Sequence, residues 1–215
     1  MDIVYEDEQL LVLNKPAELA TMGLPGSTPD LLKLATGTLT QRGHDGFVAM
    51  VGRLDYPVAG LVLAAKTRAA AGALEEQRRQ GRIHKYYCAL VGGPGFAANA
   101  GQLTHWLRPS RRHRHVDVVS PEEPGAKQAR LSYRVLQRLS QATCLEIELE
   151  TRRKHQIRAQ LAAIGQPVLG DRKYGSQVAF SPGIALVAKR VTLNHPATGM
   201  PLEFEVGFPD GWPDM

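Results

Sequence analysis

The chain has 215 residues, of which 43% are hydrophobic and 22% are charged, a balance that favours a folded protein with a core and excludes wholesale disorder. Its formal net charge of +5 is a weak sign of a polyanionic partner. The longest nearly unbroken apolar run, Val58 to Ala65, has 8 residues, fewer than the roughly 20 that a membrane helix needs, so we expect no membrane association.

The N-terminus and the cysteines indicate a cytoplasmic protein. The first residues are acidic, whereas a secretory signal begins with a basic region. Cys88 and Cys144 each lie in an apolar, strand-like run. We therefore expect two buried, reduced thiols rather than a disulfide.

The first half of the chain predicts a mixture of strands and helices. In chain order, strands are expected over residues 2–6, 9–14, 47–51 and 60–65. Ser27 or Thr28 caps a short helix that runs through Leu34, and polar residues with glycine predict a loop over 37–46. Thr67 opens a helix predicted over residues 68–80, which are rich in Ala, Glu, Gln and Arg, and Gly81 ends it.

The second half predicts mostly strands. They are expected over residues 84–91, 102–107, 115–119, 130–139, 143–150, 184–193 and 201–206. One amphipathic helix is expected over 155–164, with Ile157, Leu161 and Ile164 on one stripe. Many strands, few helices and no regular alternation predict an α+β fold with a mixed, largely antiparallel sheet flanked by helices and loops. No linker divides the chain, so we expect one domain over residues 1–215.

Positive charge is concentrated in two parts of the chain. Residues 77–116 contain no Asp or Glu, and residues 152–173 hold six Lys or Arg against one acid, Asp171. The arginines of the first stretch that we expect to bind phosphate are Arg78, Arg79, Arg82, Arg108, Arg111, Arg112 and Arg114. The alternative is that these long cationic side chains are only solvated surface residues and bind no partner.

Several common site patterns are missing from the sequence. It has no phosphate-loop motif, no G-x-G-x-x-G and no C-x-x-C. His105, His113 and His115 could be imagined around a metal, but neighbouring arginines would repel a dication, so we expect no metal site. His195, at a probable turn, is expected to cap or pack.

Two residues stand out as chemical candidates. Asp55 lies on a loop between two predicted buried strands, a common place for a catalytic group, although a lone loop Asp is usually a turn residue. Tyr87 lies in a predicted strand, where a tyrosine is usually part of the core. Tyr86 points to the opposite face of that strand, so only one of the pair can serve a site.

Three segments carry longer patterns: Gly52-Arg-Leu-Asp-Tyr-Pro-Val-Ala-Gly60, Lys85-Tyr-Tyr-Cys-Ala-Leu-Val-Gly-Gly93 and Thr151-Arg-Arg-Lys-His-Gln-Ile-Arg158. Asn14-Lys-Pro16 precedes them, and two further segments follow them: Leu161 to Gly175, which ends in Gly170-Asp-Arg-Lys-Tyr-Gly175, and His195-Pro-Ala-Thr-Gly199. Together they resemble, in order, the signatures of RluA-type RNA pseudouridine synthases.

This chain departs from those signatures at a few positions. Gly52 replaces a histidine, and Val58-Ala59 replaces Thr-Ser. Arg152 and Lys154 replace a glycine and a threonine. The Asp, Tyr and Arg that the family uses are all retained.

The resemblance implies an isomerase that converts uridine in RNA to its carbon-linked isomer, on a pseudouridine synthase-like catalytic domain. Asp55 is then the catalytic carboxylate, acting as nucleophile or as base, a choice that stays open. Tyr87 packs on the uracil and helps to move a proton, and Arg158 is the charged partner of Asp55. The resemblance implies no metal or organic cofactor, because the reaction is an isomerisation.

The resemblance also implies how RNA is held. The target uridine must be flipped out, and Arg53 could fill the gap that it leaves. Arg153, His155 and Gln156 are expected to contact the pocket or the RNA backbone. We expect a monomer without a separate N-terminal RNA-binding domain, acting on structured ribosomal or transfer RNA such as a compact stem-loop.

Two alternatives stay open at this point. One is a non-catalytic RNA-binding or RNA-chaperone module on the same fold, suggested by the departures from the signatures. The other is a glycosidase acting on a small nucleoside, which also uses a lone Asp but does not need a wide basic surface.

Overall fold

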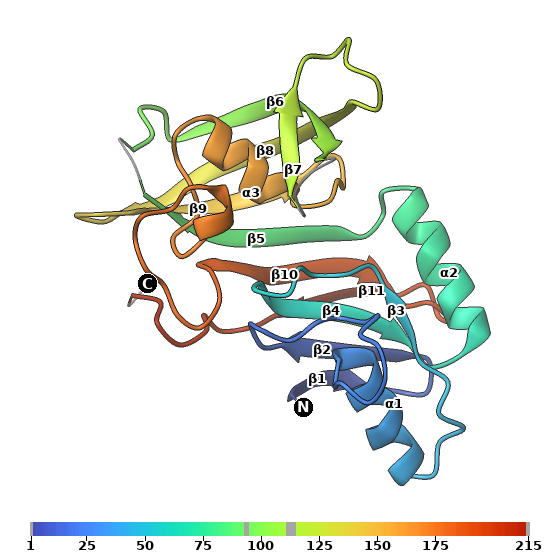
Figure 1. Cartoon of the computed structure of the whole chain (residues 1–215). Helices are drawn as coiled ribbons and strands as arrows, with labels where there is room; N and C mark the ends of the chain where they lie inside the picture. The colour runs from blue at the N-terminus through green and yellow to red at the C-terminus, as the bar shows by residue number, and fades with distance from the viewer. Residues whose placement is uncertain (1, 93–94, 111–114, 214–215) are drawn as a thin grey trace. The chain divides into compact units, whose positions relative to one another are not determined.

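A computed structural model describes residues 2–92, 95–110 and 115–213 of the chain (Figure 1). It divides into two compact units, Met1–Lys85 with Val187–Asp210, and Tyr86–Leu186 with Gly211–Met215. Within the described ranges, no helix is long and apolar enough to cross a membrane. The single domain over 1–215 stays a prediction.

The first unit is built on a mixed sheet. Its strands, in spatial order, are β1 (Asp2–Glu6), β2 (Leu10–Lys15), β4 (Ala59–Ala65) and β10 (Leu186–Asn194), with β3 (Ala49–Val51) paired to β4 and β11 (Pro201–Glu205) paired to β10. The β4–β10 pair is parallel and the other pairs are antiparallel. The predicted mixed, largely antiparallel sheet is therefore confirmed in this unit.

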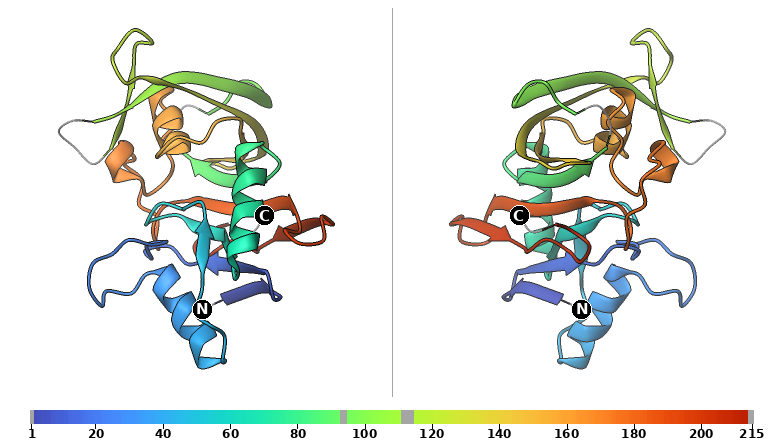
Figure 2. Two further views of the ribbon diagram at one scale, coloured as in Figure 1. Left: turned by 90° about the vertical axis from the view of Figure 1, so that its right-hand side faces the viewer. Right: turned by 90° about the vertical axis from the view of Figure 1, so that its left-hand side faces the viewer.

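Helix α2 (Arg68–Arg79) covers one face of this sheet and lies beside β3 (Figure 1 and Figure 2). Thr67 caps the helix by accepting the backbone N–H of Ala70 at 3.1 Å. Leu74 packs with Leu61 and Leu63, because alternate residues of β4 point to the same face. The predicted helix over 68–80 is confirmed to within one residue.

Helix α1 (Leu31–Gln41) differs from the prediction at both ends. Its cap is Asp30, which accepts the N–H of Lys33 at 2.9 Å, and not Ser27 or Thr28. The helix continues through the start of the predicted loop over 37–46, which is therefore wrong for residues 37–41. Leu31, Ala35 and Leu39 form a buried stripe. Burying that stripe outweighs the roughly 1 kcal/mol that an internal glycine costs.

The second unit holds an antiparallel sheet with one helix on it (Figure 1). The strands, in spatial order, are β5 (His84–Val91), β9 (Thr143–Leu149), β8 (Lys127–Arg138), β6 (Ala100–Pro109) and β7 (Val116–Val119). Ala159 of α3 (Gln156–Ala163) packs with Leu107, Val116 and Ala129 on one face of this sheet. A single 3-10 turn, η1 (Arg172–Tyr174), was not predicted. The α+β class is confirmed.

Both cysteines belong to the second unit, on the neighbouring strands β5 and β9. Cys88 and Cys144 are buried thiols, as predicted. Burial, reinforced by the nearby Cys88, raises the pKa of Cys144 to about 12. The Cys144 thiol therefore stays protonated at neutral pH and belongs to the core.

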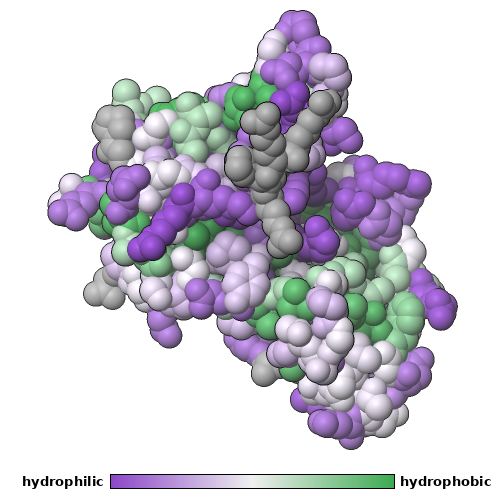
Figure 3. Space-filling view, in the orientation of Figure 1, coloured by the Kyte–Doolittle hydropathy of each residue, from purple (hydrophilic) through white to green (hydrophobic). Residues whose placement is uncertain are grey.

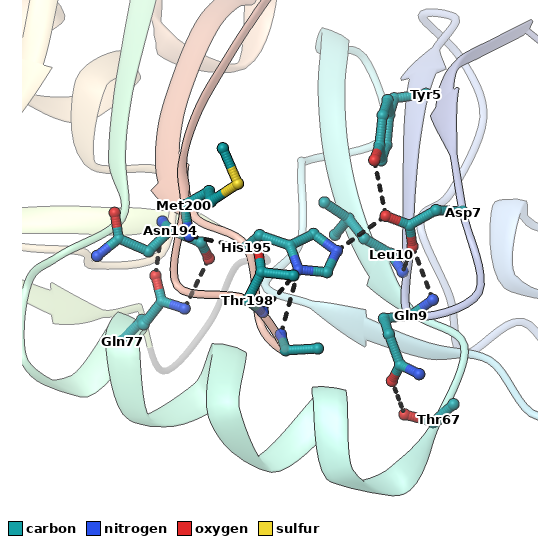
Figure 4. Close-up of polar contacts among 11 residues, drawn as sticks. Tyr5, Asp7, Gln9, Leu10, Thr67, Gln77, Asn194, His195, Thr198 and Met200 are labelled. Carbon is teal, nitrogen blue, oxygen red and sulfur yellow. Dashed lines mark hydrogen bonds and ion pairs between the residues drawn. The ribbon is translucent and has the colours of Figure 1, made fainter.

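A polar cluster ties the two ends of the first unit together (Figure 4). His195 Nε2 lies 2.8 Å from Asp7 Oδ2, while its Nδ1 accepts backbone N–H groups of the turn that follows. Asp7 also accepts bonds from the Tyr5 hydroxyl and from the N–H groups of Gln9 and Leu10, each at 2.7 Å. Burial opposes ionisation of Asp7, but these hydrogen bonds outweigh it and lower its pKa to about 2. The predicted capping role of His195 is confirmed.

Candidate active site

Asp55 lies on a short loop, residues 52–58, between β3 and β4 of the first unit, and we call this segment the Asp55 loop. Leu54 is buried, and its backbone N–H and C=O both bond to the Thr21 hydroxyl, at 3.1 and 2.9 Å. The N–H of Val58 donates to the Asp55 carbonyl at 3.1 Å and closes a turn. The loop is therefore anchored on both sides of a partly buried Asp55.

Gly52 begins this loop in a left-handed conformation, with φ of +84°. Glycine adopts that region without strain, whereas a residue with a Cβ pays for it. Replacing the family histidine by Gly52 therefore affects the backbone, because the first residue of the Asp55 loop has a left-handed conformation that suits glycine.

A second glycine fixes the end of the loop against β10. Gly60 has φ of +111°, and a Cβ built on it would lie 2.4 Å from the carbonyl oxygen of Ala188. Any other residue would push β4 and β10 apart just beyond Asp55. Gly60, the glycine that ends the Arg-Leu-Asp signature, thus allows β4 to pack closely against β10 at the end of the Asp55 loop.

Lys15 lies under the Asp55 loop and is fully buried. Its Nζ donates to the carbonyls of Leu19 at 2.7 Å, Pro16 at 2.9 Å and Tyr56 at 3.4 Å. Burial lowers the pKa of Lys15 to about 8, although the negative charge of Asp55 favours its protonated form. The sequence pattern placed Lys15 in the Asn14-Lys-Pro16 segment, directly after a predicted strand, and indicated no buried contact for it. A lysine that closes an otherwise apolar run was the signal that could have found it.

Arg158 belongs to the second unit and is held by Asp171. Its Nε and Nη2 donate to the two carboxylate oxygens of Asp171, at 2.6 and 2.9 Å, and both side chains are almost fully buried. Two parallel charge-assisted bonds fix the plane of the guanidinium. The ring of Tyr174 lies 5.0 Å from the guanidinium carbon and adds a cation–π contact. The Asp171 partner was not predicted, and the pairing of Arg158 with Asp55 stays a prediction.

The hydroxyl of Tyr174 connects two further segments to this cluster. It accepts the backbone N–H of Val116, the first residue of β7, at 2.9 Å, and lies 2.8 Å from Nδ1 of His155. His155 itself has φ of 52°, an uncommon conformation for a residue with a side chain. Tyr174 therefore positions Arg158 with its ring and His155 with its hydroxyl.

Gln156 organises the basic loop before α3. Its Oε1 accepts from the Thr151 hydroxyl at 3.0 Å and from the Arg153 N–H at 2.9 Å, and its Nε2 donates to the Arg130 carbonyl at 2.9 Å. The side chain is buried. Its direct contact with RNA stays a prediction, while these bonds present the loop that exposes residues 152–154.

Tyr87 lies in β5 of the second unit with only 9% of its surface exposed. It pairs with Ile147 of β9, and Tyr86 pairs with Glu148. The two tyrosines therefore point to opposite faces of the sheet, as expected for neighbours in a strand.

The arginines expected to bind phosphate differ in their surroundings. Arg78 and Arg79 form ion pairs with Glu75 and Glu76, one turn earlier on α2, and Arg108 pairs with Glu123. Figure 3 shows hydrophilic side chains gathered over the C-terminal end of α2, where Arg78 and Arg79 lie. Glu75 and Glu76 lie just before the acid-free stretch and Glu123 lies after it, so the positive charge of the stretch is partly balanced by residues outside it.

The remaining predicted contacts are more exposed or lie outside the described residues. Arg53 and Arg82 are exposed, and Arg153 is exposed while its Nε donates to the Gln128 carbonyl at 3.0 Å. The positions outside the described ranges are Arg111, Arg112 and Arg114. Among the described residues, no group of three His, Cys, Asp or Glu side chains is arranged to hold a metal ion.

Comparison with known proteins identifies the class to which this fold and these motifs belong. The family described as RNA pseudouridylate synthase matches residues 9–163. A dual-specificity RNA pseudouridine synthase RluA of Haemophilus influenzae is 31% identical over 211 residues, which cover 95% of this chain and 91% of that protein. An uncharacterized RNA pseudouridine synthase of Synechocystis is 34% identical over 95% of this chain and 67% of its own length.

Solved structures agree on the fold. The human RNA pseudouridylate synthase domain containing 4 superposes with a TM-score of 0.79 at 20% identity, over 97% of this chain and 89% of that one. The chain therefore belongs to the RluA-type RNA pseudouridine synthase family and is an isomerase that acts on RNA.

Proposed function

We propose that this enzyme isomerises one specific uridine in structured RNA, with Asp55 as the catalytic carboxylate. The observation that carries the proposal is the Arg53-Leu54-Asp55 segment on an anchored loop, with the Thr21 and Val58 hydrogen bonds on either side of the acid. A rigid loop holds a reacting group in place without an entropy cost at the moment of reaction.

The reaction breaks the bond between the anomeric carbon and the uracil ring nitrogen, turns the ring, and forms a bond from the anomeric carbon to ring carbon 5. The ring nitrogen gains a proton and carbon 5 loses one, so the atoms balance without a cofactor. An ionised Asp55 stabilises the positive charge that develops at the anomeric carbon, or attacks it. In this proposal Tyr87 packs on the uracil and assists the proton transfer at carbon 5.

Arg158 supplies the fixed positive charge of the proposed site. Asp171 and the Tyr174 ring hold its guanidinium in one orientation. We propose that it pairs with the Asp55 carboxylate and keeps it ionised in the presence of RNA, since a neighbouring cation favours the charged form of an acid.

The substrate of this proposal is a ribosomal or transfer RNA stem-loop, bound by a cytoplasmic monomer. The Nitrosomonas europaea relative, 33% identical, is named for the ribosomal large subunit, and the Haemophilus influenzae relative is named a dual-specificity RNA pseudouridine synthase. Exposed Arg53, Arg82 and Arg153 would bind RNA phosphates. The affinity that these contacts contribute falls as the salt concentration rises.

The test is a transcriptome-wide pseudouridine map in the source organism, with and without the gene, complemented by wild type, Asp55→Asn or Asp210→Asn. Asp210 is an exposed aspartate outside the loop and serves as the matched control. We expect one site to vanish and to return with wild type and Asp210→Asn only. Restoration by Asp55→Asn would refute the catalytic assignment. Identical maps with and without the gene would favour the non-catalytic RNA-binding alternative.

A further inference from the structure

Tyr56, the residue after Asp55, has an unusually exposed side chain. It is 56% exposed, and Met200 alone exceeds it among the large hydrophobic residues of the described ranges. A single exposed hydrophobic residue needs no explanation by itself. Tyr56 differs because of its position beside the proposed catalytic carboxylate and because of what holds its backbone.

Three features restrict the backbone of Tyr56: a hydrogen bond from Lys15, the proline that follows, and the turn that contains Tyr56. The buried Lys15 donates to its carbonyl at 3.4 Å. Pro57 follows and narrows the range of backbone conformations open to Tyr56. The turn that the Val58 N–H closes onto the Asp55 carbonyl spans this residue. The ring is therefore presented to solvent from a backbone that has little freedom to lose on binding.

The other side chains of the loop leave Tyr56 as its only exposed aromatic surface. Leu54 and Val58 are buried, and Gly52 has no side chain. Arg53 and Tyr56 are the exposed side chains of residues 52–58, and Asp55 lies between them in sequence. The loop thus offers a cation before the carboxylate and a neutral ring after it.

We infer that Tyr56 stacks on the RNA base next to the target uridine. The inference rests on the proposed function, because flipping one uridine unstacks its neighbours and exposes their faces. Exposed aromatic rings bind such faces in single-stranded loops. The charge of Asp55 repels phosphates from this side of the loop, so an uncharged base face is the part of RNA that fits there, while Arg53 accommodates a phosphate.

The experiment compares Tyr56→Ala and Tyr56→Phe with Met200→Ala, which removes the other highly exposed hydrophobic side chain of the first unit. The RNA is the stem-loop that contains the site identified by the pseudouridine map. It is used intact and with an abasic nucleotide on each side of the target in turn. Binding affinity and single-turnover rate are measured, and the urea unfolding midpoint confirms that each variant folds.

With intact RNA, we expect Tyr56→Ala to weaken binding by about 5- to 150-fold, the loss of one stacked base. Tyr56→Phe should bind like wild type, because a phenyl ring still stacks. Met200→Ala should also bind like wild type, because Met200 lies outside the Asp55 loop. One of the two abasic RNAs should bind wild type as weakly as intact RNA binds Tyr56→Ala, and the two losses should not add.

Two results would overturn the inference while leaving the proposed function intact. One is wild-type binding by Tyr56→Ala in an enzyme that still depends on Asp55. The other is a loss in Tyr56→Phe equal to that in Tyr56→Ala, which would indicate a hydrogen bond from the hydroxyl rather than stacking. Activity retained by Asp55→Asn would instead refute the proposed function, so the two failures are distinguishable.

Discussion

Two buried cations, one in each unit, are held in different ways. Lys15 is fully buried, and its Nζ is surrounded by the carbonyls of Leu19, Pro16 and Tyr56. Arg158 is 4% exposed and is clamped by both oxygens of Asp171. One cation is solvated by backbone dipoles, whereas the other has a full counter-charge at hydrogen-bond distance.

The difference assigns the two side chains different tasks. Carbonyl dipoles offset only part of the cost of burying a charge, which is why the pKa of Lys15 falls to about 8. One of its three bonds, to the Tyr56 carbonyl, reaches the Asp55 loop, and only the protonated amine has the three N–H groups that all three bonds need. A guanidinium clamped by a carboxylate instead has a permanent charge and a fixed direction. Lys15 thus shapes a loop, and Arg158 supplies a fixed field.

The largest effect is expected when the counter-charge of Arg158 is removed. Asp171→Asn leaves a buried guanidinium without its carboxylate, and breaking such a pair typically costs about 3–5 kcal/mol of folding free energy. Urea unfolding measures this loss, and single-turnover kinetics at a temperature where the variant is folded should show a reduced rate. Asp117→Asn, a more exposed aspartate of the same unit, should change stability far less. Equal losses in the two variants would contradict the clamp.

A smaller effect is expected for Lys15→Met, which keeps most of the length of the side chain but has no polar end group. It leaves carbonyls without a donor, at a cost of about 1–3 kcal/mol, but relieves the burial of a charge. The effect should depend on pH. In the unfolded chain Lys15 titrates near 10.5 and in the folded chain near 8, so between these values the unfolded chain binds more protons and wild type gains stability as pH rises.

The difference in unfolding free energy between wild type and Lys15→Met, measured by urea at several pH values, isolates this term. We expect wild type to gain on the variant from pH 8 to 10.5 and the difference to be flat below. A difference that is flat across the whole range would show that the buried amine keeps an ordinary pKa.

The sequence was sufficient for most strands and for the motif residues, because each depends on local pattern. The apolar run of β4, the alternation of β9 and the cap of α2 at Thr67 all act within a few residues. Asp55, Tyr87 and Arg158 were nominated by the signatures, and their catalytic roles stay predictions. The helix at Leu31–Gln41 was underestimated because its stability comes from a buried stripe and not from propensity.

The buried polar side chains of α3 could not be predicted in the same way. Its apolar stripe was expected at Ile157 and Leu161, yet Gln156, Arg158 and Gln160 are also buried. Hydrophobic periodicity treats such residues as exposed, because their partners come from distant segments: Gln160 donates to carbonyls of β6 and β8, and Arg158 to Asp171. The same limit applies to Lys15 and Tyr174, which lie in signature segments but whose contacts reach distant parts of the chain.

The smallest effect is expected for Tyr174→Phe, which separates the two ways in which Tyr174 contacts the Arg158 cluster. The ring stays over the guanidinium, while the Val116 N–H and His155 lose their hydroxyl partner. The two lost hydrogen bonds cost about 1 kcal/mol each, measurable by urea unfolding. The single-turnover rate should stay near wild type, because Asp171 still fixes the guanidinium. A rate loss as large as that of Asp171→Asn would show that the hydroxyl matters as much as the carboxylate for the direction of Arg158.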